Sequence, residues 1–225
     1  MSSLRLFGVT ATDAVAGDAP QQHHRPLAPG TTLVTFRELA AVVAETPYGR
    51  PALADGDVAA YRSVVECVFQ QRAVLPAPPG VVFRAREALE RWLEIHFVTL
   101  TDALAYVEGR AAARVHVARS GNRLTTGGTP VVVEGQTEEI PINVDAVASE
   151  SFRVLRRHAA ASVQLKPYPP DDAGVAAVAS FLVDRERWGA FEAAVAEEGK
   201  RDPELQFRLT GPWPPYDFVR MQFGR

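Results

Sequence analysis

The sequence predicts an α+β protein of two domains that is followed by an extended tail. Three observations lead to this prediction: short apolar runs typical of strands, apolar side chains at helical spacing, and a strand–helix order of β-α-β-β-α-β in the second half. With 225 residues, 47% of them apolar, the chain can bury one large core or two small ones. We expect residues 1–110 to form an N-terminal α+β domain, residues 111–211 a C-terminal domain and residues 212–225 the tail.

The N-terminal domain is expected to begin with a strand over residues 4–10. Two β-rich runs, TTLVTFR and LAAVVAETP, have a brief connection between them, which predicts adjacent strands. A helix that Asp55 or Asp57 can cap follows. Its apolar residues recur at helical spacing, namely Val58, Tyr61, Val65 and Val68.

A single long helix is predicted over residues 86–107, after the extended stretch AVLPAPPGVVF. Its apolar side chains form one continuous stripe: Leu89, Trp92, Leu93, Phe97, Leu100, Leu104 and Val107. Gly109 is expected to end this helix.

The second half reads as strand AARVHVA, helix SESFRVLRRHAAA, strand SVQLKPY, strand VAAVASFLV, helix RERWGAFEAAVAEEG and strand ELQFRLTG. This order predicts a ferredoxin-like βαββαβ domain, in which two helices pack on one face of a four-stranded antiparallel sheet. Segment 119–149 interrupts it as a variable insertion. Its runs VVV and IPINV predict a hairpin, and we expect it to be the least ordered part of the domain.

Charge and cysteine content exclude several classes of protein. The 24 basic and 27 acidic residues give a net charge of −3, which provides no field to hold nucleic acid. Cys67 has no partner for a disulfide, which suits a reducing compartment. The stretch MSSLRLFGVTATDAV lacks the features of a signal peptide, and no run approaches the ~20 apolar residues of a membrane span. We therefore expect a cytoplasmic protein with no membrane and no nucleic-acid partner.

Residues that often carry chemistry occur here in ordinary contexts. His23 and His24 lie in a predicted loop that supplies too few ligands for a metal. Cys67 is expected to fill a small apolar space on a helix. His96 and His116 have apolar neighbours and are expected in the core or at its boundary.

Glycines and charged pairs give no stronger signal. The stretch SGNRLTTGG lacks the GK[ST] ending of a phosphate-binding loop. The carboxylates of Glu138, Glu139, Asp171 and Asp172 are expected in solvated turns. A cluster of Arg153, Arg156, Arg157 and His158 is expected on the solvated face of a helix. The sequence therefore predicts no catalytic, cofactor-binding or metal-ligating residue, no cofactor and no enzyme.

The C-terminal stretch LTGPWPPYDFV, Leu209 to Val219, is rich in proline. Because proline lacks a backbone N–H and fixes φ, Pro212, Pro214 and Pro215 exclude a helix and tolerate a sheet only at its margin. A rigid extended segment is predicted.

The aromatic residues of this stretch leave two alternatives open. Trp213, Tyr216 and Phe218 either pack against the body of the protein or form an exposed patch for a partner. Apolar residues continue through Met221 and Phe223, as though a final strand followed the prolines. This alternation favours burial.

The stretch LTGPWPPYDFV also resembles the C-terminal signature of the GvpL/GvpF family of gas vesicle proteins. The segments LRLFGV, LAAVVAE, VLPAPPGVVF, VEGRAAARVHV and VASFLVDRERWGAF resemble the family in the same order. The resemblance covers both halves and leaves out the loop near residue 20 and segment 119–149. Tyr61 stands where many members have a histidine, and Pro79 replaces an aromatic residue.

The resemblance implies a non-enzymatic accessory or structural protein of gas vesicle assembly, located in the cytoplasm at the gas vesicle. It implies binding to the hydrophobic shell protein GvpA and to other accessory proteins. It also implies a modified ferredoxin-like C-terminal domain and a tail that docks between the domains. Residues expected in tail docking or partner contact are Pro212, Trp213, Pro214, Pro215, Tyr216 and Phe218. The alternative hypothesis is a ferredoxin-like domain that binds a small ligand outside gas vesicles.

Overall fold

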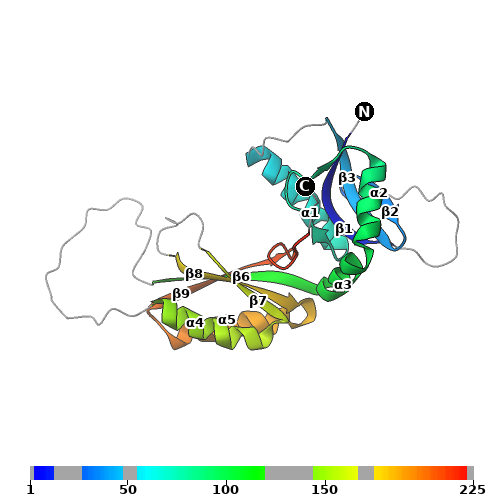
Figure 1. Ribbon diagram of the computed structural model, residues 1–225. Helices are drawn as coiled ribbons and strands as arrows, with labels where there is room; N and C mark the ends of the chain where they lie inside the picture. The colour runs from blue at the N-terminus through cyan, green and yellow to red at the C-terminus, as the bar shows by residue number, and fades with distance from the viewer. Residues whose placement is uncertain (1–2, 13–26, 48–54, 120–143, 167–174, 222–225) are drawn as a thin grey trace. The chain divides into compact units, whose positions relative to one another are not determined.

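The structure, a computed structural model, describes residues 3–12, 27–47, 55–119, 144–166 and 175–221 (Figure 1). The chain divides into two compact units. The first consists of Met1–Ala112 together with Pro212–Arg225, and the second of Ala113–Gly211. Each unit combines helices with an antiparallel sheet, so the α+β class is confirmed.

The sheet of the first unit has the strand order β2-β3-β1-β4, and β5 also pairs with β1. These strands are β1 (Ser3–Ala11), β2 (Thr32–Phe36), β3 (Leu39–Thr46), β4 (Leu75–Pro76) and β5 (Val82–Phe83). β2 and β3 are antiparallel neighbours in a register that runs from Thr32 opposite Val43 to Phe36 opposite Leu39. The predicted pairing of TTLVTFR with LAAVVAETP is therefore confirmed.

Gly8 allows β1 to approach β4 closely. The register of β1 against β3 shifts between Leu6 and Gly8, which marks an irregularity in the strand. A Cβ atom at Gly8 would lie 2.7 Å from the carbonyl oxygen of Leu75, a distance that no side chain tolerates. Only glycine therefore fits here.

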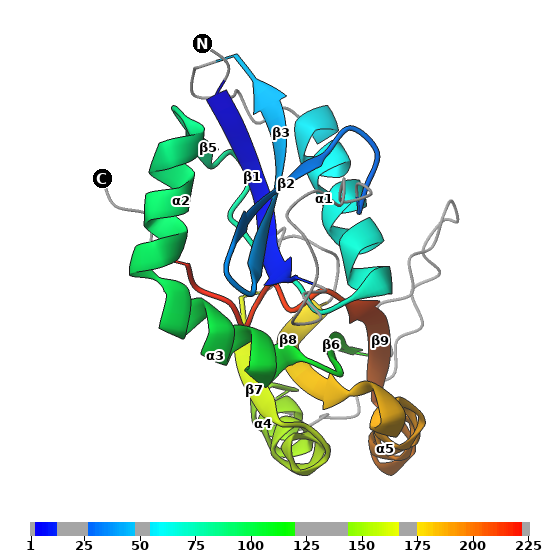
Figure 2. The same ribbon diagram turned by 90° about the vertical axis from the view of Figure 1, so that its right-hand side faces the viewer.

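Helices cover both faces of this sheet (Figure 2). On one side, α1 (Asp55–Gln71) buries the predicted residues Tyr61, Val65 and Val68. On the other side lie α2 (Arg86–Ile95) and α3 (Phe97–Val107), whose apolar stripe joins one core cluster with the strands. Strand β3 is consequently buried on both faces, which explains its nearly continuous apolar sequence.

The predicted single helix over residues 86–107 is in fact two helices. His96 has φ −99° and ψ 9°, outside the helical region, and separates α2 from α3. The run Phe97, Val98, Thr99 contains two β-branched residues, which lower helix propensity at this point. Leu93 before the break and Leu100 after it belong to the same core. The predicted stripe is otherwise correct, except that Phe97 is only partly buried.

Gly109 follows the end of α3, as predicted. α3 ends at Val107, and Gly109 has φ +68°, in the left-handed region that glycine adopts without strain.

The second unit has a four-stranded sheet of order β7-β8-β6-β9. Its elements follow the predicted sequence order: β6 (Arg110–Arg119), α4 (Val144–Leu155), η1 (Arg156–His158), β7 (Ala161–Leu165), β8 (Val175–Asp184), η2 (Arg185–Arg187), α5 (Trp188–Arg201) and β9 (Leu205–Trp213). β7 and β8 are antiparallel. Figure 1 shows α4 and α5 on the same face of the sheet.

The core of this unit lies between that face and the two helices. Alternate residues of β6, such as Val115 and Val117, meet Phe152 and Leu155 of α4 and Phe191 of α5. Phe181 of β8 packs with its ring centroid 5.3 Å from that of Phe191 and 6.0 Å from that of Phe152. Period-two strands and helical stripes thus meet as the sequence predicted.

Helix α4 begins earlier than predicted, at Val144 rather than near Ser149. Ala148 belongs to the same buried face as Phe152 and Leu155, which extends the helical stripe toward the N-terminus. The predicted hairpin in segment 119–149 falls on residues 120–143, which lie outside the described residues.

Candidate functional site

The tail follows the margin of a sheet, where the prolines place it. Pro212 lies within β9, which ends at Trp213. The backbone then turns, because the N–H of Tyr216 donates to the carbonyl of Pro214 at 2.7 Å and that of Phe218 donates to Pro215 at 3.1 Å. The predicted final strand beyond the prolines is therefore wrong for the described residues up to Met221. Phe223 lies outside them.

Burial in the tail is distributed differently from the prediction. Pro214 and Pro215 are buried, whereas Tyr216 and Phe218 are partly buried. The expected burial is wrong for Trp213, whose side chain is 38% exposed. β9 ends at Trp213 and its last three residues are all exposed, whereas the turn that follows carries the prolines inward.

The end of the tail contributes to the core of the first unit. Val219 and Met221 pack against the core cluster that also contains Leu89, Leu93 and Leu104. These two side chains are themselves partly buried. Apolar area that leaves water here stabilises the tail against the first unit.

Tyr61 on α1 lies near this tail. Its ring stacks on Phe7 of β1 with centroids 6.2 Å apart and an interplanar angle of 17°, and its hydroxyl donates to the carbonyl of Ala77. Burial raises the pKa of Tyr61 well above its ordinary value, neighbouring Tyr216 raises this pKa further and Arg5 lowers it. Tyr61 thus lies between the first strand and the tail as a neutral hydrogen-bond donor.

Arg5 supplies positive charge beside Tyr61. Its guanidinium lies 5.4 Å from the centroid of the Phe7 ring and 4.0 Å from the carboxylate of Asp57, and it donates to the Asp57 carbonyl at 3.4 Å. Asp57 lies in the first turn of α1, where a carboxylate is favourable. These contacts hold the start of α1 against β1.

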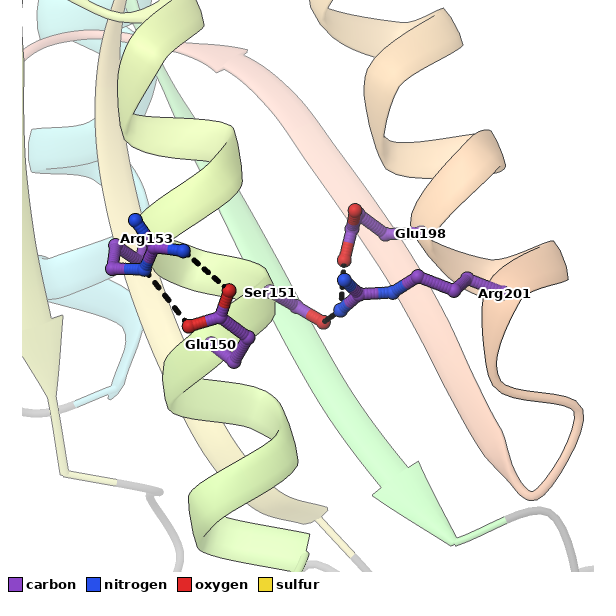
Figure 3. Close-up of polar contacts among 5 residues, drawn as sticks. All are labelled: Glu150, Ser151, Arg153, Glu198 and Arg201. Carbon is purple, nitrogen blue, oxygen red and sulfur yellow. Dashed lines mark hydrogen bonds and ion pairs between the residues drawn. The ribbon is translucent and has the colours of Figure 1, made fainter.

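A second polar cluster joins the two helices of the second unit (Figure 3). Arg201 of α5 forms an ion pair with Glu198 at 2.7 Å and donates to the hydroxyl of Ser151 on α4 at 3.1 Å. Glu198 is 6% exposed and Ser151 is fully buried. A buried carboxylate needs such a partner, so this cluster fastens α4 to α5. The spacing of Glu198 and Arg201 was visible in the sequence, but Ser151 is 50 residues away.

The basic cluster on α4 and η1 is solvated, as predicted. Arg153 forms two hydrogen bonds to the carboxylate of Glu150, at 2.6 and 2.8 Å, and this bonding lowers the pKa of Glu150 (Figure 3). Arg156 donates to the hydroxyl of Ser162 at 3.0 Å. Arg157 and His158 are exposed. The groups lie on a solvated surface, where such pairs stabilise little.

The remaining candidates occupy boundary positions. Cys67 is partly buried and its thiol donates to the carbonyl of Leu27 at 3.3 Å, so it is more polar in its contacts than the predicted apolar filler. His96 and His116 are partly buried, at the core boundary.

Other candidates lie outside the described residues: His23, His24, Glu138, Glu139, Asp171, Asp172 and the whole stretch SGNRLTTGG. Among the residues that the structure does describe, no group of three or more His, Cys, Asp or Glu side chains is arranged to hold a metal ion. Within the same residues, no helix is long and apolar enough to cross a membrane.

Comparison with known families gives a match over most of the chain. Residues 6–127 and 136–220 match the family described as gas vesicle synthesis protein GvpL/GvpF. The match includes the loop near residue 20 and most of segment 119–149, so the resemblance extends further than the sequence motifs indicated.

Individual relatives agree with this match. The chain is 28% identical over 194 residues to gas vesicle protein F2 of Halobacterium salinarum, covering 85% of this chain and 81% of that protein. It is similar in fold to the crystal structure of gas vesicle protein GvpF from Anabaena sp. PCC7120, with a TM-score of 0.73, 16% identity and coverage of 100% of this chain and 99% of that one. The GvpF structure from Microcystis aeruginosa gives a TM-score of 0.68 at 13% identity, covering 97% and 99% of the two chains.

Proposed function

The chain belongs to the GvpL/GvpF family of gas vesicle synthesis proteins, and from this premise we propose that it is a non-enzymatic accessory protein of gas vesicle assembly that binds the shell protein GvpA. A role related to gas vesicles follows from the family itself. The binding to GvpA, the absence of catalysis and a location in the cytoplasm at the gas vesicle belong to the proposal. Other accessory proteins of the gas vesicle are further partners.

The observation that carries this proposal is the family match along both halves of the chain, together with relatives named as gas vesicle proteins. Fold similarity at 16% identity supports the architecture alone.

The proposal includes the architecture that the family resemblance implies. We infer a ferredoxin-like C-terminal domain over residues 111–211, supported by the element order from β6 to β9 and the strand order β7-β8-β6-β9. Residues 1–110 form the N-terminal domain of this proposal. The variable insertion of the C-terminal domain, predicted over segment 119–149, would end where α4 begins at Val144.

We propose that the tail, residues 212–225, docks between the domains. The buried prolines and the packing of Val219 and Met221 support docking. The residues proposed for tail docking or partner contact are Pro212, Trp213, Pro214, Pro215, Tyr216 and Phe218. Trp213, the most exposed of the three aromatic residues, suits contact with a partner.

A pull-down with the shell protein tests this proposal. Affinity-tagged full-length chain is co-expressed with GvpA, and another accessory protein known to retain GvpA serves as the positive control. We expect GvpA to co-purify with the chain. Failure of GvpA to co-purify while the positive control retains it would overturn the proposed binding.

A further inference from the structure

The outer face of α3, together with Ile95 at the end of α2, exposes large apolar side chains. Ile95 and Val98 are each 69% exposed and Tyr106 is 45% exposed. Val98, Asp102, Ala105 and Tyr106 are spaced by four, three and one residues, so they lie on one face of the helix. The opposite face carries the buried residues Leu100, Leu104 and Val107. We call the outer set, consisting of Ile95, Val98, Asp102, Ala105 and Tyr106, the α3 strip.

The adjacent helix α2 shows that this exposure is unusual for the unit. Before Ile95, most outward positions of α2 are charged, and they include Arg86, Glu87, Glu90, Arg91 and Glu94. Arg86 donates to Glu90 at 2.8 Å in an i,i+4 pair typical of a solvated helix face. On α3 the corresponding surface has Asp102 as its charged member. Thr99 and Thr101 are also exposed on α3, so the apolar members of this surface are Val98, Ala105 and Tyr106 on α3 and Ile95 on α2. Large apolar side chains that gather at exposed positions indicate a partner surface.

Arginines pack against the aromatic ring of the α3 strip, Tyr106, and against two rings beside the strip. The guanidinium of Arg37 lies 5.0 Å from the centroid of Phe97 and 5.4 Å from that of Phe36. Arg110 lies 5.0 Å from the centroid of Tyr106 and donates to its carbonyl. Such cation–π contacts fix rings in one orientation. The contact with Arg110 therefore restrains Tyr106 before a partner arrives, which lowers the entropic cost of ordering this ring on binding.

The turn that positions Arg37 is strained. Arg37 connects β2 to β3 and has φ +52°, a left-handed conformation that costs energy for any residue other than glycine. The position sets the guanidinium against both Phe36 and Phe97, whose centroids lie 6.0 Å apart.

The size of the α3 strip favours one helix as its occupant. α3 has 11 residues, which span about 16 Å along the axis. A stable interface between two globular chains buries about 800 Å² on each partner, more than a strip one helix wide supplies. An amphipathic helix that lays its apolar face along the strip matches it in length and width. Asp102, within the strip, calls for a lysine or arginine in the apolar face of that helix.

We propose that the α3 strip is the docking surface for a single amphipathic helix of the shell protein, with a basic residue opposite Asp102. The inference rests on the proposed function, because it takes the shell protein as the partner. It adds the surface, the secondary structure of the bound segment and the charge that the segment carries.

Fluorescence anisotropy with synthetic peptides tests this docking. Overlapping fluorescein-labelled peptides that together cover GvpA are titrated with the full-length chain. We expect one peptide to bind. The Ile95→Ser/Val98→Ser variant should raise the Kd for this peptide by about tenfold or more. The matched control is Glu87→Ser/Arg91→Ser on the outer face of α2, which also replaces two exposed side chains and leaves the net charge unchanged. Its Kd should stay within about twofold of the original value.

A charge exchange provides the second variant. Asp102→Lys should raise the Kd for the same peptide by about tenfold. A peptide in which the opposing basic residue is replaced by glutamate should then bind Asp102→Lys better than it binds the original chain. Thermal melting measured by circular dichroism should be the same for all variants, because every substituted side chain is exposed.

The outcomes separate this inference from the proposed function. If GvpA binds and the Ile95→Ser/Val98→Ser variant binds it equally well, the α3 strip is not the site, although the proposed function stands. If intact GvpA binds but no peptide does, docking by a single helix is overturned. If light scattering shows a dimer that the variant abolishes, the occupant is a second copy of this chain. If neither GvpA nor any peptide binds, the proposed function fails together with the inference.

Discussion

The tail and the helix α3 both bring large apolar side chains to the first unit, but they place them differently. In the tail, Pro214 and Pro215 are buried and Val219 packs on the core. At the junction of α2 and α3, Ile95 and Val98 are each 69% exposed, only a few residues from Leu93, which is fully buried. Residue type therefore does not determine burial here. Backbone position does: Ile95 and Val98 lie off the buried stripe of their helices, and the turn after Trp213 carries the prolines inward.

The largest change in stability is expected from the inner, buried face of the helices α2 and α3. Leu93→Ala removes a fully buried side chain from the core and should lower the free energy of unfolding by about 3 kcal/mol. Ile95→Ala, two residues away, should change it by less than about 0.5 kcal/mol. Urea denaturation measures both. Equal losses in the two variants would show that the inner and outer faces have been assigned wrongly.

A smaller effect is expected where α1 approaches the tail. Tyr61→Phe removes the hydroxyl that donates to Ala77 and leaves a buried carbonyl without this donor, so stability should fall by about 2 kcal/mol. Tyr106→Phe is the matched control, because its hydroxyl belongs to a partly exposed ring on α3. Chemical denaturation of the two variants should therefore differ. If the Tyr61→Phe protein is as stable as the Tyr106→Phe protein, the hydrogen bond to Ala77 does not stabilise the fold.

Trp213→Ala measures how much the exposed aromatic residue of the tail stabilises the fold. Because Trp213 is 38% exposed, its loss should cost about 1.5 kcal/mol, less than the 3 to 5 kcal/mol of a fully buried large aromatic residue. Thermal and urea unfolding provide the value. A loss as large as that of Leu93→Ala would mean that Trp213 is buried in solution.

The raised pKa of Tyr61 predicts a specific alkaline instability. The unfolded chain loses its tyrosine proton near pH 10, whereas the folded protein holds this proton to higher pH. The folded state therefore binds more protons above pH 10, and its stability falls as pH rises. Between pH 9 and pH 11, the titration of Tyr61 should lower the free energy of unfolding by about 1 kcal/mol. Denaturation at pH 9 and pH 11 should show a smaller loss in Tyr61→Phe than in the original chain, and identical losses would contradict the prediction.

Much of the fold could be predicted because periodicity records burial. The pairing of β2 with β3, the buried stripe of α1 and the order of elements in the second unit all follow from residues that repeat at a period of 2 or 3.6. Side chains such as Val115 and Phe152 lie where this repetition places them.

Breaks and turns of the backbone leave no periodic pattern in the sequence, so they could not be predicted from it. The stripe through Leu93 and Leu100 continues across His96, so the sequence predicts one helix although the backbone breaks. The burial of Pro215 in place of Trp213 depends on a turn formed by backbone hydrogen bonds.

The candidate surface on α3 left a weak signal in the sequence. Ile95 and Val98 lie off the predicted stripe, on the side that should face solvent. Large apolar residues at such positions indicate a partner surface when they gather. Arg110 lies four residues after Tyr106, a spacing that the sequence shows, whereas Arg37 meets Phe97 from a distant position that no spacing rule finds.

We propose that this chain binds the gas vesicle shell protein, and light scattering coupled to size-exclusion chromatography measures this binding. Purified full-length chain is mixed with GvpA over a range of ratios, and the mass of the eluting species is measured. We predict a new species that contains both proteins and whose amount increases with GvpA until the chain is saturated. Elution of the chain at its own mass at every ratio, under conditions where another accessory protein forms such a species, would contradict the account.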